Sequence, residues 1–341
     1  MNWPKLQDSF NSPASTMALV RRVLAFGCVA LGMVAAPASA QTDNFPNQPI
    51  RLLIGFAPGG SSDTVARIMA PKLGELIKQN IVIDNKPGAG GNIATDLLIK
   101  APPDGHTIML GTVGSIAVNQ HLNKLSYNPI TDMAPLSMAV IFSNVLVVNA
   151  ASDVRNFEDY LKQARVENSR LSFGSSGIGS GGHLAGELLK TAAGLNNQHV
   201  AYRGGAPAMN DLLGGVLPSI FSSPTDAVQH IQTGKLRAIA STGNKRLEAL
   251  PNVPTIAESG YPGFEAVNWY GFAAPLRTPP EIVKKWNAAL VTTLKDPSVV
   301  AQLRKLGLEP APSTPEDAAK YYRTESDKWG ALIRKAKIKA E

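Results

Sequence analysis

The chain has 341 residues, a formal net charge of +7 at pH 7 and a single cysteine. This length is enough for two domains, each with its own core. The sequence contains no repeats or low-complexity tracts of the kind found in fibrous or disordered proteins. Much of the positive charge falls near the C-terminus, around Lys328, Arg334 and Lys335. A charge run of this kind is typical of a solvated helix face, which argues against a nucleic-acid groove.

The first forty residues have the order of a secretory signal peptide. Two arginines precede an apolar run from Val23 to Ala36, and Ala38-Ser39-Ala40 is a small-residue cleavage site. The run is shorter than the roughly 20 residues that a membrane-spanning helix needs. The sequence therefore predicts export to a bacterial periplasm with cleavage after Ala40, from a start at Met1 or Met17. Cleavage would remove Cys28 and leave a chain without disulfides.

Two glycine-rich turns lie about thirty residues apart, each between an apolar strand and an amphipathic helix. The first runs from Phe56 to Asp63 after a strand over 50–56, and the second runs from Pro87 to Asn92 after a strand over 81–83. A third strand is predicted over 107–110. This β-α-β-α-β alternation predicts a parallel sheet with helices on its faces.

Glycine turns at the start of helices are suited to bind anions. The backbone can approach a ligand closely there, and the first N–H groups of a helix have no partner within it. Neither turn holds the lysine of a nucleotide-binding loop, so a small carboxylate is favoured over a polyphosphate. The alternative is that the glycines only permit tight turns. The main role expected for Asp63 and Asn92 is to cap their helices, and contact with a ligand is the alternative.

The alternation of strands and helices starts again in the middle of the chain. The predicted strands cover 144–148, 171–174, 199–202, 219–221 and 238–241, and the helices cover 157–166, 183–193, 206–213 and 225–232. After a strand over 269–274, three helices that each open with a proline are expected to pack on the first sheet. The prediction is an α/β protein in which residues 45–146 and 268–341 form domain 1 and residues 147–267 form domain 2.

The chain is expected to cross between these domains twice, near residues 145–149 and 265–270. A double crossing would permit hinge closure over a ligand in the cleft. Trp269 lies at the second crossing, where an indole would either form the floor of the cleft or pack in a core.

Loops at the ends of other strands supply further candidate binding residues. Thr112 and Ser115 follow the third strand of domain 1, and Ser175 and Ser176 follow a strand of domain 2. Arg203 ends the next strand, where it would either pair with a second carboxylate of the ligand or remain solvated.

Other signals give little support for a cofactor. Residues 177–182 match the pattern G-x-G-x-x-G, but no acidic residue ends the next strand to hold a ribose. The five histidines lack the spacing of metal ligands, and neither a hydrolase elbow nor a carboxylate pair stands out. We therefore predict no cofactor, no metal site and no enzymatic activity.

The loops resemble those of the Bug family, the extracytoplasmic solute receptors of tripartite tricarboxylate transporters. The resemblance covers nearly the whole chain after residue 40 and is carried by Pro49-Ile50-Arg51, Phe56-Ala57-Pro58-Gly59-Gly60 with Asp63, Asn85-Lys86-Pro87-Gly88-Ala89-Gly90-Gly91-Asn92, Pro103-Asp104-Gly105, Tyr202-Arg203-Gly204-Gly205-Ala206-Pro207-Ala208, Asp211-Leu212-Leu213-Gly214-Gly215, Val253-Pro254-Thr255 and Trp269-Tyr270-Gly271. It implies a type II periplasmic-binding-protein fold, in which two α/β domains enclose a ligand cleft.

The resemblance also implies that backbone groups of the two glycine loops hold a ligand carboxylate. Carried over residue by residue, it indicates Phe56, Ala57, Gly59, Ser61, Ser62, Asp63, Ala89, Gly90 and Asn92, with Thr112, Ser115, Ser175, Ser176 and Asp226 forming the rest of the pocket. One departure concerns the far wall of the pocket. Family members often carry an aspartate in the strand after the double glycine, whereas this chain has Pro218 there. Because proline cannot donate to a sheet, the strand is expected to start late, and the identity of the ligand stays open.

The resemblance implies a monomeric receptor that captures a small mono-, di- or tricarboxylate and delivers it to the membrane subunits of a tripartite tricarboxylate transporter. Two rival functions remain. One is a receptor that presents the same ligands to a signalling partner. The other is a periplasmic hydrolase that uses Ser175 or Ser176, for which the sequence shows no partnered base.

Overall fold

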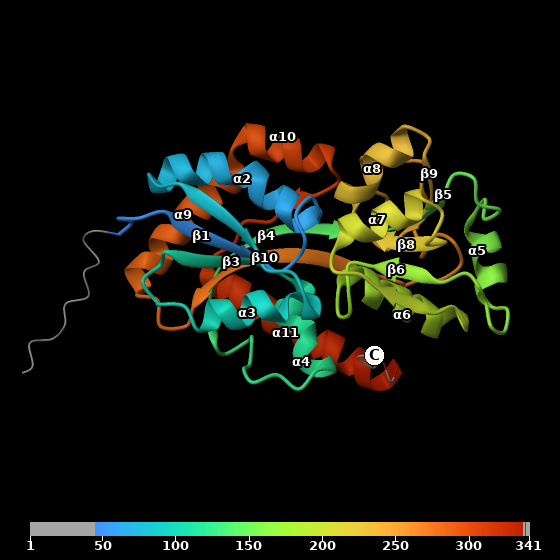
Figure 1. Cartoon of the computed structure of the whole chain (residues 1–341), viewed down its shortest axis with the longest axis horizontal. Coiled ribbons are helices and arrows are strands. Elements are labelled where there is room, and N and C mark those ends of the chain that lie inside the picture. Colours follow the sequence, from blue (N-terminus) through green and yellow to red (C-terminus); the bar gives the residue numbers. More distant parts are fainter. Residues whose placement is uncertain (1–44, 337, 339–341) are drawn as a thin grey trace, which may run out of the picture. The chain divides into compact units, whose positions relative to one another are not determined.

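The computed structural model describes residues 45–336 and 338, and Figure 1 shows their arrangement. The predicted signal peptide lies outside the described residues. Among the helices of the described part, none is both long and apolar enough to span a membrane. The strands form two sheets, one of six strands and one of five.

The six-stranded sheet has the strand order β11-β4-β10-β3-β1-β2. Its strands are β1 (Ile50–Ile54), β2 (Ile81–Asn85), β3 (Thr107–Thr112), β4 (Met133–Ser143), β10 (Val267–Pro275) and β11 (Glu309–Pro310). Strand β1 pairs in parallel with β2 and β3, which confirms the predicted parallel unit. Strand β10 lies between β3 and β4 and is antiparallel to both. The sequence prediction missed β4.

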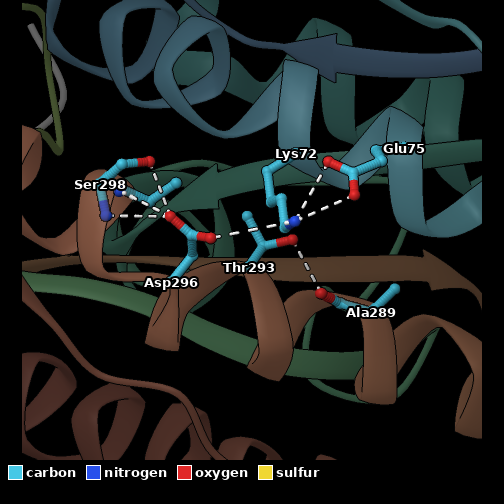
Figure 2. A network of polar contacts seen from close by, with 7 residues as sticks. Lys72, Glu75, Ala289, Thr293, Asp296 and Ser298 are labelled. Atoms are coloured by element: carbon cyan, nitrogen blue, oxygen red, sulfur yellow. Dashed lines mark hydrogen bonds and ion pairs between the residues drawn. The ribbon is translucent and has the colours of Figure 1, made fainter.

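Helices cover both faces of this sheet (Figure 1). They are α2 (Ser61–Ile77), α3 (Asn92–Ile99), α4 (Asn119–Leu122), α9 (Pro280–Lys295), α10 (Pro297–Lys305) and α11 (Pro315–Ala336), with short turns η1 (Ala89–Gly91) and η2 (Gly114–Val118). The three C-terminal helices begin at prolines, as predicted, and α9 and α11 pack on β4. Lys72 links α2 to the start of α10 (Figure 2). Its Nζ lies 3.1 Å from Glu75 of the same helix and 3.9 Å from Asp296, the cap residue just before α10.

The five-stranded sheet has the order β7-β6-β8-β5-β9. Its strands are β5 (Val145–Asn149), β6 (Phe173–Ser175), β7 (His199–Ala201), β8 (Ser219–Ser222) and β9 (Leu236–Ser241), and its helices are α5 (Phe157–Ala164), α6 (Gly181–Ala193), α7 (Gly205–Leu213) and α8 (Pro224–Gln232). These elements confirm the predicted second α/β set. Strand β8 begins directly after Pro218, which agrees with the late start expected there.

Thr242 joins the two places where the chain passes between the sheets. It is fully buried, and its hydroxyl accepts from the N–H of Asn144 at 2.9 Å and donates to the carbonyl of Ala266 at 2.8 Å. Asn144 connects β4 to β5, and Ala266 precedes β10. The division into domains at the boundaries given above stays a prediction.

Candidate functional site

A narrow pocket of about 30 Å³ lies where four helices begin. The residues that line it are Phe56, Gly60, Ser61, Ser62, Thr112, Asn144, Ser176, Ser180, Gly181, Gly182, Gly205, Ile220, Phe221, Ser222, Ser223, Asp226, Asn268 and Tyr270. This set contains the first residues of α2, α6 and α7, and it contains the residue before α8, Ser223, and the third residue of that helix, Asp226. The N-terminus of a helix carries a partial positive charge, so the four ends together favour an anion in the pocket.

Two of these helices present N–H groups that have no partner in the described part of the chain. Gly60 precedes α2 without any side-chain capping bond, and the first hydrogen bond of the helix is from Thr64 N–H to Gly60 C=O. The N–H groups of Ser61 and Ser62 are therefore available for a ligand. In α6 the Ser180 hydroxyl accepts from His183 N–H, which leaves the N–H groups of the two intervening glycines.

Close packing explains why α6 begins with two glycines. A Cβ at Gly182 would collide with the carbonyl oxygen of Phe221, and a Cβ at Gly181 would collide with the side chain of Asn268. Both neighbours also line the pocket. Only glycine lets the start of α6 come this close to β8 and β10.

A hydroxyl cluster connects α2 to α8 at the edge of the pocket. Ser61 Oγ accepts from Ser223 Oγ at 2.9 Å and from Thr225 Oγ1 at 2.6 Å. The latter two hydroxyls also lie 2.5 Å apart. The cluster fixes the start of α2 against that of α8.

The structure divides the predicted binding residues among three groups. Phe56, Ser61, Ser62, Thr112, Ser176 and Asp226 line the pocket. A neighbouring hollow of about 200 Å³ shares two of these residues, and its lining includes Phe56, Ala89, Gly90, Ser176 and Arg203. The remaining predicted residues, Ala57, Gly59, Asp63, Asn92, Ser115, Ser175 and Trp269, line neither. The two glycine turns thus face adjoining hollows, whereas the sequence predicted a single cradle.

Asp63 and Gly59 contact each other, which leaves neither free for a ligand. The Asp63 carboxylate accepts from the N–H of Gly59 at 2.9 Å and from Arg67 Nε at 2.8 Å. Burial by itself would raise the pKa of Asp63, but the bonds from Arg67 and Gly59 outweigh it and hold the pKa below its usual range. Asp63 therefore stabilises the beginning of α2, as the sequence suggested.

Asn92 and Ser115 are also held within the protein. Asn92 Oδ1 accepts from Asn119 Nδ2 at 2.7 Å, and the same amide group donates to the carbonyl of Gly90 at 2.9 Å. Ser115 Oγ accepts from the N–H of Thr112 at 3.0 Å. These bonds fix the second glycine turn and the end of β3, so the two side chains have a structural role.

Trp269 does not form the floor of the pocket. It is fully buried and stacks on Tyr322, with ring centroids 5.1 Å apart, and its indole N–H donates to Glu325 at 3.0 Å. Side chains alternate between the two faces of a strand, so its neighbours in β10, Asn268 and Tyr270, line the pocket instead. The sequence analysis missed both, although this alternation was a usable signal.

Ser175 has a histidine partner that the sequence did not reveal. Its Oγ lies 2.7 Å from His199 Nε2, and the His199 ring packs 4.2 Å from that of His183. Burial lowers the pKa of His199 to about 3 and that of His183 to about 4, so both are neutral and His199 is a weak base. Ser175 is fully buried, and His199 Nδ1 has no partner among the residues described. The pair therefore lacks both an exposed nucleophile and an orienting carboxylate. Its role is to contribute packing and a hydrogen bond within the protein interior.

Asp226 is the one charged residue in the lining of the pocket. Burial raises the pKa of its carboxyl group to about 7. Burial also raises the pKa of Tyr270, on β10, and the Asp226 charge adds to this effect. Within residues 45–336, no group of three or more His, Cys, Asp or Glu side chains lies close enough to hold a metal ion.

Comparison with known proteins places these features in context. The sequence pattern of the family described as "Tripartite tricarboxylate transporter family receptor" matches residues 65–338. The protein BugT of Bordetella pertussis is 33% identical over 315 residues, which cover 91% of this chain and 96% of BugT.

Two solved structures of Rhodopseudomonas palustris proteins are also similar. One was solved with adipate, is 34% identical with a TM-score of 0.83, and matches over 87% of this chain and 99% of its own. The other, MatC with bound malate, is 29% identical with a TM-score of 0.80 and matches over 85% of this chain and 100% of its own. The similarity confirms the predicted two-domain periplasmic-binding-protein fold.

Proposed function

The chain belongs to the family of tripartite tricarboxylate transporter receptors, and on this basis we propose that it is a periplasmic receptor that binds a small carboxylate in the four-helix pocket and delivers it to the membrane subunits of such a transporter. Proteins of this family bind solutes and are not enzymes. The family description supports handover to a transporter, and the helix starts around the pocket support a carboxylate site there.

The observation that carries the proposal is the group of unpartnered N–H donors at the helix starts. A hydrogen bond to a charged acceptor contributes about 1.5–3 kcal/mol. A micromolar complex needs only about −8 kcal/mol. The N–H groups of Ser61, Ser62, Gly181 and Gly182 therefore supply enough donors for a carboxylate, although no arginine or lysine lines the pocket.

The ligands of the relatives support the same class of solute. Adipate and malate are small acids with two carboxylates each, and they are bound by similar proteins of this family. The cavity of about 30 Å³ has room for little more than one or two water molecules. A bound acid therefore requires the residues that line the pocket to move apart, which fits a receptor that opens and closes around its ligand.

Ser61 offers a test that isolates the backbone N–H from the side chain. Ser61 is the first residue of α2, where proline is well tolerated, and Gly60 before it has the extended conformation that proline prefers. Ser61→Ala removes the hydroxyl alone, whereas Ser61→Pro removes the hydroxyl and the N–H. We expect Ser61→Pro to bind malate or adipate on the order of tenfold more weakly than Ser61→Ala in isothermal titration calorimetry.

Equal affinities of the two variants would contradict the role of the backbone donors. The delivery step needs a separate measurement, namely uptake of radiolabelled ligand by cells that lack the protein and carry either it or the Ser61→Pro variant. Unchanged uptake without the protein would contradict the transport function and favour a receptor for signalling.

A further inference from the structure

Asp226 differs from three other aspartates that occupy the same position in their helices. Each of those is the third residue of its helix and accepts a hydrogen bond of 2.9 Å at the helix start: Asp63 of α2 from Gly59 N–H, Asp159 of α5 from Arg155 N–H, and Asp317 of α11 from the Thr314 hydroxyl. Asp226 is the third residue of α8, but its carboxylate makes no hydrogen bond or ion pair with any residue that the structure describes. Its carboxylate therefore does not serve to begin the helix.

The Asp226 side chain points toward the pocket. Its Oδ2 lies so close to the backbone of Gly205 that a Cβ at this position would collide with it. The glycine at the start of α7 thus makes room for the carboxylate, and both residues line the cavity. A half-buried, unpartnered carboxylate that faces a cavity is suited to bind a positively charged group of a ligand.

The charged groups on the elements around α8 do not neutralise this carboxylate. Asp63 and Arg67 of α2 pair with each other, Asp211 of α7 accepts from Tyr202, and Arg237 of β9 donates to backbone carbonyl groups. On α8 itself, His230 makes no ion pair with Asp226, and β10 contributes only the phenol of Tyr270. Strand β5 carries no titratable side chain. The missing positive charge is therefore expected from the ligand.

We propose that Asp226 makes this pocket selective for amino acids, whose protonated amino group it binds while the helix starts of α2 and α6 hold the carboxylate. The inference rests on the function proposed above and narrows its ligand class. An ammonium group beside Asp226 replaces the hydration that burial removes from the carboxylate. A plain dicarboxylate would instead bring a second negative charge toward Asp226. By this reasoning the protein differs in preference from its relatives solved with adipate and malate.

Succinate, malate and aspartate provide the test, because they differ only in the group on one carbon, which is hydrogen, hydroxyl or ammonium. We expect calorimetry at about pH 8 to show aspartate bound on the order of tenfold or more tightly than succinate. The preference should shrink toward about pH 6, because Asp226, whose pKa is about 7, then takes up a proton. Adipate with 2-aminoadipate, and propionate with alanine, extend the comparison to longer acids and to single carboxylates.

Two variants assign the preference to Asp226. Asp226→Asn keeps the shape of the side chain and should abolish both the preference for the amino acid and its change with pH. Asp159→Asn, at the same position of α5 and outside the pocket, should leave both unchanged. Thermal unfolding of each variant verifies that it is folded.

The outcomes separate this inference from the proposed function. Binding of plain acids at least as tight as that of their amino counterparts, or a preference that persists in Asp226→Asn, would overturn the inference and leave the carboxylate receptor intact. Failure of every acid in the series to bind would overturn both.

Discussion

Gly59 and Gly90, one in each glycine turn, have similar backbone conformations but different surroundings. Gly59 has φ of +81° and Gly90 has φ of +62°, so an alanine at either position is strained by about 1–2 kcal/mol. A Cβ at Gly59 would find its nearest neighbour 4.0 Å away. A Cβ at Gly90 would lie 2.5 Å from the carbonyl oxygen of Ile178, in the segment between β6 and α6.

The difference predicts that only Gly90→Ala affects binding. An ordinary contact between carbon and oxygen is about 3.3 Å, so the segment around Ile178 must withdraw by roughly 0.8 Å. Overpacking of this kind costs about 1–3 kcal/mol, which corresponds to a loss of affinity on the order of tenfold. Gly59→Ala should stay within roughly twofold of the unchanged protein.

Two assays on the same samples distinguish strain from displacement. Urea denaturation should show a loss of unfolding free energy in both variants that is larger in Gly90→Ala, because only that variant is overpacked, and calorimetric titration with malate or adipate should show weaker binding in Gly90→Ala alone. Gly215→Ala, with φ of +74° and no atom within 4 Å of its Cβ, is a control for the strain. An equal loss of affinity in Gly59→Ala and Gly90→Ala would refute the reasoning.

Three further predictions concern stability. Glu325→Leu leaves two buried indole N–H groups without an acceptor and should cost about 2–6 kcal/mol in urea denaturation, with a smaller loss in Glu325→Gln. Because the pKa of Asp226 is raised from 3.8 to about 7, the stability of the ligand-free protein should fall as pH rises from about 4 to 7, and Asp226→Asn should therefore raise the unfolding temperature more at pH 8 than at pH 5. His199 has the opposite sign, since its pKa is lowered to about 3, so its contribution is lost as pH falls below about 6.5, and His199→Asn should reduce the destabilisation between pH 7 and pH 5 by about 2 kcal/mol.

The sequence predicted the elements that carry a strong local pattern. Strands β1 and β3 are nearly continuous apolar runs, and the starts of α9, α10 and α11 are marked by proline. Strand β4 was missed because Pro135 and Ser137 interrupt its apolar pattern, and its conformation depends on pairing with β10, more than a hundred residues later. Such long-range pairing leaves no periodicity within the strand itself.

The binding residues were predicted where a helix start was recognised and missed where it was not. Ser61 and Ser62 line the pocket, as the first glycine turn suggested. Gly181 and Gly182 were considered only as a dinucleotide motif, although they too begin a helix after a strand. That α2, α6, α7 and α8 begin around one cavity depends on the packing of two sheets, which local sequence does not encode.

The position of β10 has a consequence for how the polypeptide matures. Strands β3 and β4 do not pair with each other but only through β10, which the ribosome makes about 125 residues after β4 ends. The elements from β5 to β9, by contrast, are contiguous and can assemble as soon as they emerge. A product that stops short of Val267 would leave β3 with an open edge and β4 without a partner on either side, so the sheet depends on the last quarter of the chain to close a gap left near its beginning.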